Sequence, residues 1–355
     1  MLRRVKKIFE LEASTGILLL IATIAALAVA NSENFEVYHQ FFAIKIPLNL
    51  DFIGIQKDLT LHDWINDALM AVFFLLVGLE LKEEVTVGEL STKSKAMLPA
   101  IAAVGGVVVP ALIFYICNHD QEQNLRGFAV PTATDIAFAY GIICLFGKKV
   151  SKSLKVFLIS LAIFDDLMAI AIIAIFYSQN INVTFIIASL LIIAILAILN
   201  LKNCTNLTIY LIVGGFLWLT VLKSGIHSTV AGIILALFIP RQKDLVHTLI
   251  KKIAPTVNFL ILPLFAFANS GVKVDHFSLE TFTSPLVLGV ILGLFLGKQI
   301  GVTLFSYIAI KMGICHLPRT PKGVSSWLEF YGVAVITGVG FTMSFFIGSL
   351  AFVNN

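Results

Sequence analysis

Two adjacent carboxylates, Asp165 and Asp166, lie in the middle of an apolar run from Val156 to Tyr177. The run is long enough to cross a bilayer as a helix, which needs about 20 apolar residues. Each charged side chain at mid-membrane costs about 2.5–3.5 kcal/mol even on lenient insertion scales, so such residues mark ion pathways. Consecutive helical positions diverge by about 100°, so the two carboxylates cannot easily share one partner. Apolar flanks on both sides argue against a loop, and the pattern predicts an ion site.

An interrupted apolar run, residues 127–140, adds a third carboxylate. Pro131 removes a backbone donor, and the hydroxyls of Thr132 and Thr134 compete for the freed groups. Irregular backbone at this depth survives only where it lines a cavity or is buried in protein. Asp135 follows the break, where a carboxylate neutralises the partial positive charge of a half-helix start. The alternative is a plain proline kink with an aspartate that reaches toward the interface.

One lysine, Lys298, stands at the centre of a later apolar run. An unpaired ammonium group in the membrane loses its proton or finds a carboxylate, and Asp135, Asp165 and Asp166 are the candidate partners. The glycine-rich segment 336–342 lies at mid-depth in the last run and is expected to be broken there. The alternative is that Gly-x-Gly in this helix only permits close packing.

The second apolar run has acidic residues at both ends: Asp67 near its start, and Glu80 and Glu84 near its end. A functional role for Glu80 and Glu84 and a solvated helix end with internal ion pairs explain this spacing equally well. His227, a lone histidine near the outer end of another run, is more often satisfied by its neighbours than functional.

The amino-acid composition is that of a membrane protein rather than a soluble one. Charged residues make up only 13 % of the 355, whereas a soluble chain has about 25 %. The formal charge of +4 is distributed over short loops, so it does not predict nucleic-acid binding. Cys117, Cys144, Cys204 and Cys315 have no metal-ligand spacing and are expected to be small apolar fillers. No cofactor is predicted.

Eleven apolar runs of span length predict an all-α polytopic membrane protein, with residues 1–355 as a single transmembrane domain. Of the 25 lysines and arginines, 19 fall on one side of the alternating spans, which places the N-terminus in the cytoplasm. The basic N-terminus, the apolar run after it and Ala28-Val29-Ala30 also fit a cleaved signal peptide. A retained first span agrees better with the alternation downstream.

The long outer loop, Asn31 to about Thr60, contains a roughly alternating, β-branched segment at 43–58. It predicts an external β-hairpin with a turn near Asn49 to Asp51. The open edges of a hairpin can pair with a second copy, which would form a homodimer. A hairpin that lies on the protein's own surface explains the pattern equally well.

Several motifs together resemble those of NhaA-type Na⁺/H⁺ antiporters, collinearly over essentially the whole chain. These motifs are Asn66-Asp67 through Gly78-Leu79-Glu80, Thr132-Ala133-Thr134-Asp135, Phe164-Asp165-Asp166, Lys223-Ser224-Gly225-Ile226-His227, Leu262 to Gly271, Gly297-Lys298 and Gly338 to Ser344. This family is itself a standard example of inverted-repeat transporters with discontinuous helices. The resemblance implies that the fourth and eleventh helices are unwound and cross at mid-membrane.

The resemblance also assigns roles to residues. Asp165 and Asp166 are implied to bind the cation and the protons, and Thr134 lines that site. Asp135 and Lys298 offset the helix dipoles at the crossing, and Lys298 pairs with Asp165. The implied activity is electrogenic exchange of cytoplasmic Na⁺ or Li⁺ for external protons across the bacterial inner membrane, with no cofactor and a lipid bilayer as the surroundings.

The implied pH response involves Glu80, Glu84 and His227, but this cluster is only partly kept. Glu83 stands where a basic residue is usual, and Ile250, Lys251 and Ala254 stand where an acid and histidines are often found. Regulation by pH is therefore expected to differ from the usual alkaline activation. The chain also ends just past the eleventh span, so the fold is expected to lack the family's twelfth helix, and the C-terminus is expected outside.

Three other functions compete with antiport. An intramembrane aspartyl protease could pair Asp135 with Asp165, but its Gly-x-Gly-Asp signature is absent because Phe341 follows Gly340. A sodium-coupled solute symporter of similar architecture would move an organic solute with Na⁺. An inactive truncated paralogue would insert normally but catalyse no exchange.

Overall fold

The computed structural model describes residues 2–50, 55–178, 180–241, 244–273, 279–320 and 323–352. Within these ranges, seven helices are long and apolar enough to cross a membrane, or ten spans if each of three bent helix pairs is counted as one. The chain is therefore a helical polytopic membrane protein. The number eleven stays a prediction, because α11 (Val230–Phe238) has only nine residues.

The chain forms two compact units, and each unit combines segments far apart in the sequence. Unit 1 comprises Met1–Ile21, Glu84–Ile172 and Lys273–Asn355. Unit 2 comprises Ala22–Glu83 and Ile173–Val272. Three helices, α1 (Leu2–Ala30), α4 (Met70–Thr86) and α8 (Lys152–Phe176), continue from one unit into the other.

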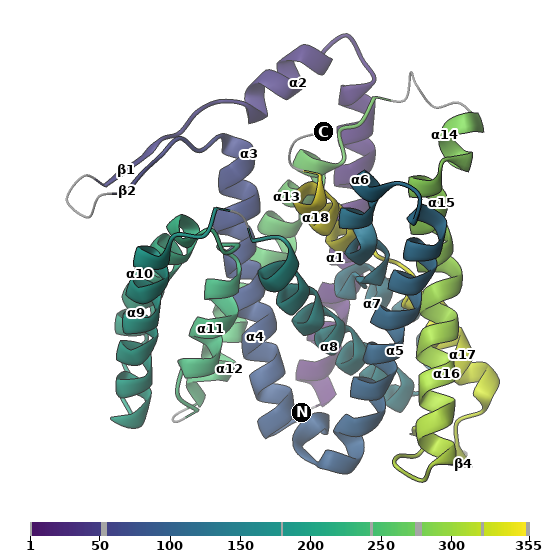
Figure 1. Cartoon of the computed structure of the whole chain (residues 1–355). Coiled ribbons are helices and arrows are strands. Elements are labelled where there is room, and N and C mark those ends of the chain that lie inside the picture. Colours follow the sequence, from purple (N-terminus) through teal and green to yellow (C-terminus); the bar gives the residue numbers. More distant parts are fainter. Residues whose placement is uncertain are drawn as a thin grey trace. The chain divides into compact units, whose positions relative to one another are not determined.

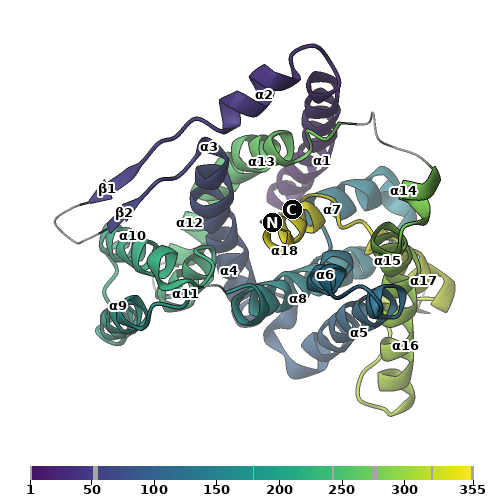
Figure 2. The same cartoon turned by 45° about the horizontal axis from the view of Figure 1, so that its top comes forward.

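Unit 1 holds the predicted ion site. Besides parts of α1, α4 and α8, its elements are η3 (Glu89–Ser91), α5 (Lys93–Asn118), α6 (Glu122–Leu125), η4 (Arg126–Thr132), α7 (Ile136–Leu145), η5 (Gly147–Lys149), α14 (Leu279–Thr283), α15 (Pro285–Leu292), η8 (Gly293–Gly297), α16 (Lys298–Lys311), the strand pair β3 (Arg319–Thr320) and β4 (Gly323–Val324), α17 (Trp327–Ile336) and α18 (Phe341–Ala351). α16 runs alongside α5 in both views (Figure 1, Figure 2).

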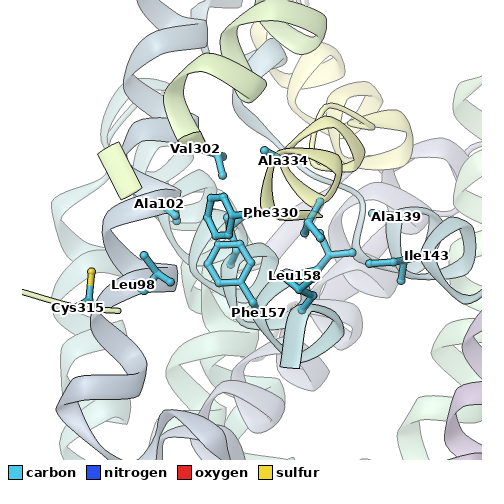
Figure 3. Packing of buried hydrophobic residues seen from close by; sticks show 14 of the residues in the cluster. Leu98, Ala102, Ala139, Ile143, Phe157, Leu158, Val302, Cys315, Phe330 and Ala334 are labelled. Carbon is cyan, nitrogen blue, oxygen red and sulfur yellow. The ribbon is translucent and has the colours of Figure 1, made fainter. Parts of the chain in front are cut away.

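A buried apolar cluster fixes the helices of unit 1 around the site. Figure 3 shows most of its side chains, which come from α5, α7, α8, α16 and α17 and, for Cys315, from the segment between α16 and α17. Phe157 of α8 packs against Phe330 of α17 with ring centroids 4.8 Å apart. Aromatic pairs at this separation add about 0.5–1.5 kcal/mol beyond their buried area. The cluster therefore holds α8 against the first half of a bent helix pair.

Two helix pairs in unit 1 are bent where the sequence predicts breaks. The axis turns by 44° between η4 and α7, and by 47° between α17 and α18. Thr132 bonds back to the carbonyl of Ala129 through its hydroxyl, as expected beside Pro131. The second break spans Gly338 and Gly340, after which α18 begins at Phe341.

Unit 2 contains the loop that the sequence predicts to be external and the remaining helices. Besides parts of α1, α4 and α8, its elements are α2 (Phe35–Phe42), β1 (Leu48–Leu50), β2 (Ile55–Lys57), α3 (Leu61–Asp63), η2 (Trp64–Leu69), α9 (Val183–Leu201), α10 (Leu207–Ser224), α11, α12 (Leu245–Thr256), η7 (Val257–Ile261) and α13 (Leu262–Asn269). α9 and α10 lie side by side in both views (Figure 1, Figure 2).

The loop expected to form a hairpin contains an antiparallel pair, with Leu48 opposite Lys57 and Leu50 opposite Ile55. The strands are shorter than the segment 43–58, and the connection at 51–54 lies outside the described residues. α2 was not predicted in this loop. It is held by Tyr38, whose hydroxyl donates to the carbonyl of Phe267 at 2.5 Å.

Candidate ion-binding site

The adjacent carboxylates lie on α8, and Asp165 and Asp166 are each only 1 % exposed. They are part of a continuous helix of 25 residues, which agrees with the prediction of a helix rather than a loop. A buried carboxylate is costly unless it is paired with a cation or hydrogen-bonded. The surroundings of the pair therefore decide what it can bind.

Lys298 supplies the counter-charge to Asp165. Its Nζ lies 2.5 Å from Asp165 Oδ2, and neither side chain has exposed surface. Of the three carboxylates that the sequence allowed as partners, the structure places Asp165 at the ammonium group. Removal of one member of such a buried pair typically costs about 3–5 kcal/mol, because an uncompensated charge stays behind.

Thr134 lies in the unwound link between η4 and α7 and contacts the same carboxylate oxygen. Its Oγ1 is 2.7 Å from Asp165 Oδ2 and 2.8 Å from the backbone carbonyl oxygen of Thr337. Thr134 and Thr337 are both fully buried. One hydroxyl thus connects the carboxylate on α8 to the end of α17.

Asp135 connects the two helix breaks. It is the N-cap of α7, where Oδ1 accepts from Phe138 N–H at 2.9 Å. Its Oδ2 accepts from Thr342 N–H at 3.2 Å and from the Thr342 hydroxyl at the start of α18. Its own N–H donates to Val339 O at 2.8 Å. One carboxylate therefore lies at the positive ends of two half-helices, where negative charge is favourable.

Close helix packing positions Lys298. Gly301, one turn further along α16, faces Gly105 of α5 so closely that a Cβ on either residue would overlap the other's backbone. Gly297, directly before Lys298, packs in the same way against Pro110 of α5. Lys298 is therefore fixed on a helix that cannot move away from α5 without losing this contact.

The arrangement favours a small hard cation or a proton over a transition metal. The nearby donors are carboxylate, hydroxyl and carbonyl oxygens, and the described residues contain no group of three or more His, Cys, Asp or Glu side chains fit to hold a metal. Asp165 Oδ1 is buried and has no hydrogen-bond partner within the described ranges. A cation that binds this oxygen would satisfy it.

A second polar group, in unit 2, surrounds Asp67 in the π-helix η2. Ser228 donates to Asp67 Oδ1 at 2.8 Å, and His227 Nε2 lies 3.7 Å from the same atom. Trp218 donates its ring N–H to the backbone carbonyl of Asp67 at 3.2 Å. The π-helical turn is typical of functional positions. His227 is thus bonded within unit 2, to Asp67 and to the Thr229 hydroxyl.

Glu80 and Glu84 are four residues apart near the C-terminal end of α4, and both are half-buried. Glu80 follows Asp67 by 13 residues along one helical segment, or about 20 Å at 1.5 Å per residue. Because His227 lies against Asp67, the structure does not bring His227 together with Glu80.

Sequence reasoning missed several contacts. His247 on α12 bonds Glu83 at 2.8 Å, and Lys82 donates to the carbonyls of Leu237 and Ile239 at the end of α11. Nothing in the spacing of these residues indicates such long-range pairs. The contact of the Thr342 hydroxyl with Asp135 could have been predicted, because a threonine just after a glycine-rich break is well placed to bond a neighbouring carboxylate.

The fold and the site together define the class: a polytopic helical protein with a buried ion pair beside two helix breaks, as in ion transporters. The sequence matches the family Na⁺/H⁺ antiporter 1 over residues 6–355. It is 47 % identical over 355 residues to the Na⁺/H⁺ antiporter NhaA of Pelagibacter ubique (strain HTCC1062), which covers 99 % of this chain and 90 % of the relative. It is also 46 % identical over 358 residues to Na⁺/H⁺ antiporter NhaA 2 of Campylobacter jejuni subsp. jejuni serotype O:23/36 (strain 81-176). This match covers 100 % of this chain and 92 % of the relative.

The family match covers nearly all of the chain, and both relatives share close to half of its residues. The chain therefore belongs to the Na⁺/H⁺ antiporter family.

Proposed function

We propose that this protein exchanges cytoplasmic Na⁺ for external H⁺, with both ions competing for the carboxylates Asp165 and Asp166. The observation that carries this proposal is the buried Asp165, whose Oδ2 is shared by Lys298 and Thr134 while Oδ1 has no partner in the described part of the chain. Membership of the antiporter family supports the identity of the two ions. Li⁺, which presents the same charge to the same oxygens, is the second cation we expect to be carried.

The exchange follows from mutual exclusion at one desolvated site. A carboxylate out of water gains free energy from any cation that reaches it, whether a proton or Na⁺. The two cannot occupy the same oxygen, so each displaces the other. Because the site alternately opens to the two sides of the membrane, displacement on one side and rebinding on the other produce antiport. More than one proton per Na⁺ makes the exchange electrogenic and sensitive to the membrane potential.

Lys298 and Asp135 have different parts in this mechanism. Lys298 stabilises Asp165 while it is charged, and an arriving Na⁺ competes with the ammonium group for the same carboxylate. Asp135 holds together the starts of α7 and α18, so that the two bent pairs, as discontinuous fourth and eleventh spans, cross at mid-membrane. The carboxylate of Asp135 is fully used as a helix cap, which argues against a protease that pairs it with Asp165.

The surroundings and regulation complete the proposal. The protein is placed in the bacterial inner membrane with its N-terminus in the cytoplasm, as the distribution of lysines and arginines favours. The β1–β2 hairpin lies outside and pairs with a second copy. A pH response resides in Glu80, Glu84 and His227, and Asp67 takes part through its contact with His227. These properties give the cell sodium tolerance and pH homeostasis.

The test is Na⁺-evoked proton movement in everted membrane vesicles from a host without its own antiporters, scanned over about pH 6.5 to 9. Asp166→Asn should abolish the exchange. Asp120→Asn is the matched control, since this carboxylate is 86 % exposed and should leave the exchange unchanged. Inserted wild-type protein without exchange at any pH would overturn the proposal in favour of an inactive paralogue. Sodium uptake coupled to an organic solute would instead indicate a symporter.

A further inference from the structure

The hydroxyl of Thr134 has one proton and two acceptors. Asp165 Oδ2 lies 2.7 Å from Thr134 Oγ1, and the carbonyl oxygen of Thr337 lies 2.8 Å from it. Both oxygens are acceptors when Asp165 is ionised, and a hydroxyl group donates a single proton. The two contacts therefore compete, although their distances are nearly equal.

The charge on Asp165 decides the competition. A hydrogen bond to an ionised carboxylate is about twice as strong as one to a neutral carbonyl. While Asp165 is charged and empty, Thr134 accordingly donates to Asp165. Thr337 directly follows the last residue of α17, so its fully buried carbonyl has no partner within that helix and then loses its donor.

Occupation of Asp165 reverses the preference. A proton on the carboxylate removes its negative charge, and a protonated Oδ2 donates its own O–H to Thr134 Oγ1. Thr134 then turns its proton to Thr337 O, so no proton is transferred to or from the threonine. Na⁺ has the same effect, because it attracts the oxygen of the hydroxyl and orients the hydrogen away from itself.

We propose that Thr134 is a positioning residue that senses whether Asp165 is occupied. The direction of its hydroxyl proton transmits this state to the break between α17 and α18. The inference rests on the proposed exchange of Na⁺ and H⁺ at Asp165. Its residues all belong to unit 1. Either ion stabilises the end of α17 by satisfying Thr337 O, and the empty site does not.

This signal meets a requirement of antiport. An exchanger must change its open side when it carries either ion and must not do so when it is empty, because an empty return would uncouple the two fluxes. A sensor must therefore treat H⁺ and Na⁺ alike and distinguish both from the bare carboxylate. The hydroxyl of Thr134 does so by responding to charge alone.

Three charged side chains lie near Asp165. Lys298 of α16 donates to the same Oδ2, Asp166 follows on α8 itself, and Asp135 at the break before α7 bonds Thr342. From the α17–α18 pair, the contacts at the break come from Thr337, Val339 and Thr342, none of which titrates. The change in charge that Thr134 experiences is thus that of Asp165.

Hydrogen exchange of the full-length purified protein tests the sensor without any transport step. The measured peptide covers residues 333–342, whose break is held by Gly338 N–H to Val335 O at 3.1 Å and Val339 N–H to Ile336 O at 3.2 Å. Asp165→Asn represents the neutral site. In Na⁺-free buffer at one alkaline pD, we expect it to slow exchange of this peptide about threefold to tenfold relative to wild type, which is the net effect of one hydrogen bond.

The Thr134 variants complete a double-mutant cycle. Thr134→Val should remove the effect of Asp165→Asn, whereas Thr134→Ser, which keeps the hydroxyl, should preserve it. Thr337→Val is the matched control, because it removes a neighbouring hydroxyl but leaves the carbonyl in place. If Thr134→Val misfolds, Thr134→Ala replaces it in the cycle.

Two results would overturn the sensor: equal exchange in wild type and Asp165→Asn, or an undiminished difference between them in the Thr134→Val background. Either can occur while Na⁺ still evokes proton movement in vesicles, so failure of the sensor is separate from failure of the proposed function.

Discussion

Asp135 offers the sharpest test of how the two helix breaks are held together. Its carboxylate caps α7 through Phe138 N–H and α18 through Thr342 N–H, and it also accepts from the Thr342 hydroxyl. Asp135→Ala removes all three acceptor contacts at once. No water replaces them readily, because Asp135 and Thr342 are each only 2 % exposed.

The expected cost follows from the two helix starts. Loss of an N-cap typically costs about 0.5–2 kcal/mol. A buried donor left without an acceptor costs about 1–3 kcal/mol. Since two half-helices lose their cap together, Asp135→Ala should destabilise the protein by at least about 2 kcal/mol. Asp135→Asn keeps one acceptor oxygen, so it should cost roughly half as much.

The assay is the apparent midpoint of thermal unfolding in detergent, read from the loss of helical circular dichroism at one heating rate. The midpoints should rank wild type, Thr342→Val, Asp135→Asn and Asp135→Ala from highest to lowest, because Thr342→Val removes only the hydroxyl contact. An Asp135→Ala variant that unfolds at the wild-type midpoint would refute the argument. So would an Asp135→Asn variant less stable than Asp135→Ala.

Three further predictions concern other parts of the chain. Lys298→Met should destabilise the protein by about 3–5 kcal/mol, and the added change Asp165→Asn should restore much of that stability in the same unfolding assay, because it removes the uncompensated charge. Burial raises the pKa of the Cys315 thiol, so maleimide labelling of Cys315 should begin at a higher pH in the folded protein than in the denatured protein; equal pH profiles by mass spectrometry would contradict this. Tyr38→Phe should lower stability by about 0.5–1.5 kcal/mol through loss of one hydrogen bond, and an unchanged midpoint would show that α2 is held by its aromatic contacts alone.

The parts of the site that sequence predicts best are those set by local rules. Charged residues within an apolar run identify Asp165, Asp166 and Lys298 because the membrane makes each one expensive. Proline and glycine predict where the chain bends, yet composition alone does not separate breaks from tolerated prolines. Pro110 lies inside the continuous α5, whereas the bend near Pro131 has the capping carboxylate and hydroxyls around it.

The remaining features depend on contacts between distant segments. Thr337 acts through a carbonyl, which every residue has, so its type carries no signal for its contact with Thr134. The α2 helix was missed because its stability comes from the packing of Tyr38 on α13 rather than from the helix propensity of its eight residues. A short helix in isolation is marginal, and tertiary packing decides whether it forms.

The π-helical turn η8 lies directly before Lys298 and sets the direction in which its side chain leaves the helix. A π-turn holds one residue more than the corresponding stretch of α-helix, so it rotates everything after it by about 100°. Deletion of one residue from Gly293–Gly297 that restored regular α-geometry would turn Lys298 away from Asp165 without changing any side chain of the ion pair. The direction of the charge is therefore encoded in the length of the helix rather than in its composition, so a one-residue insertion or deletion can gain or lose the pair in a single step.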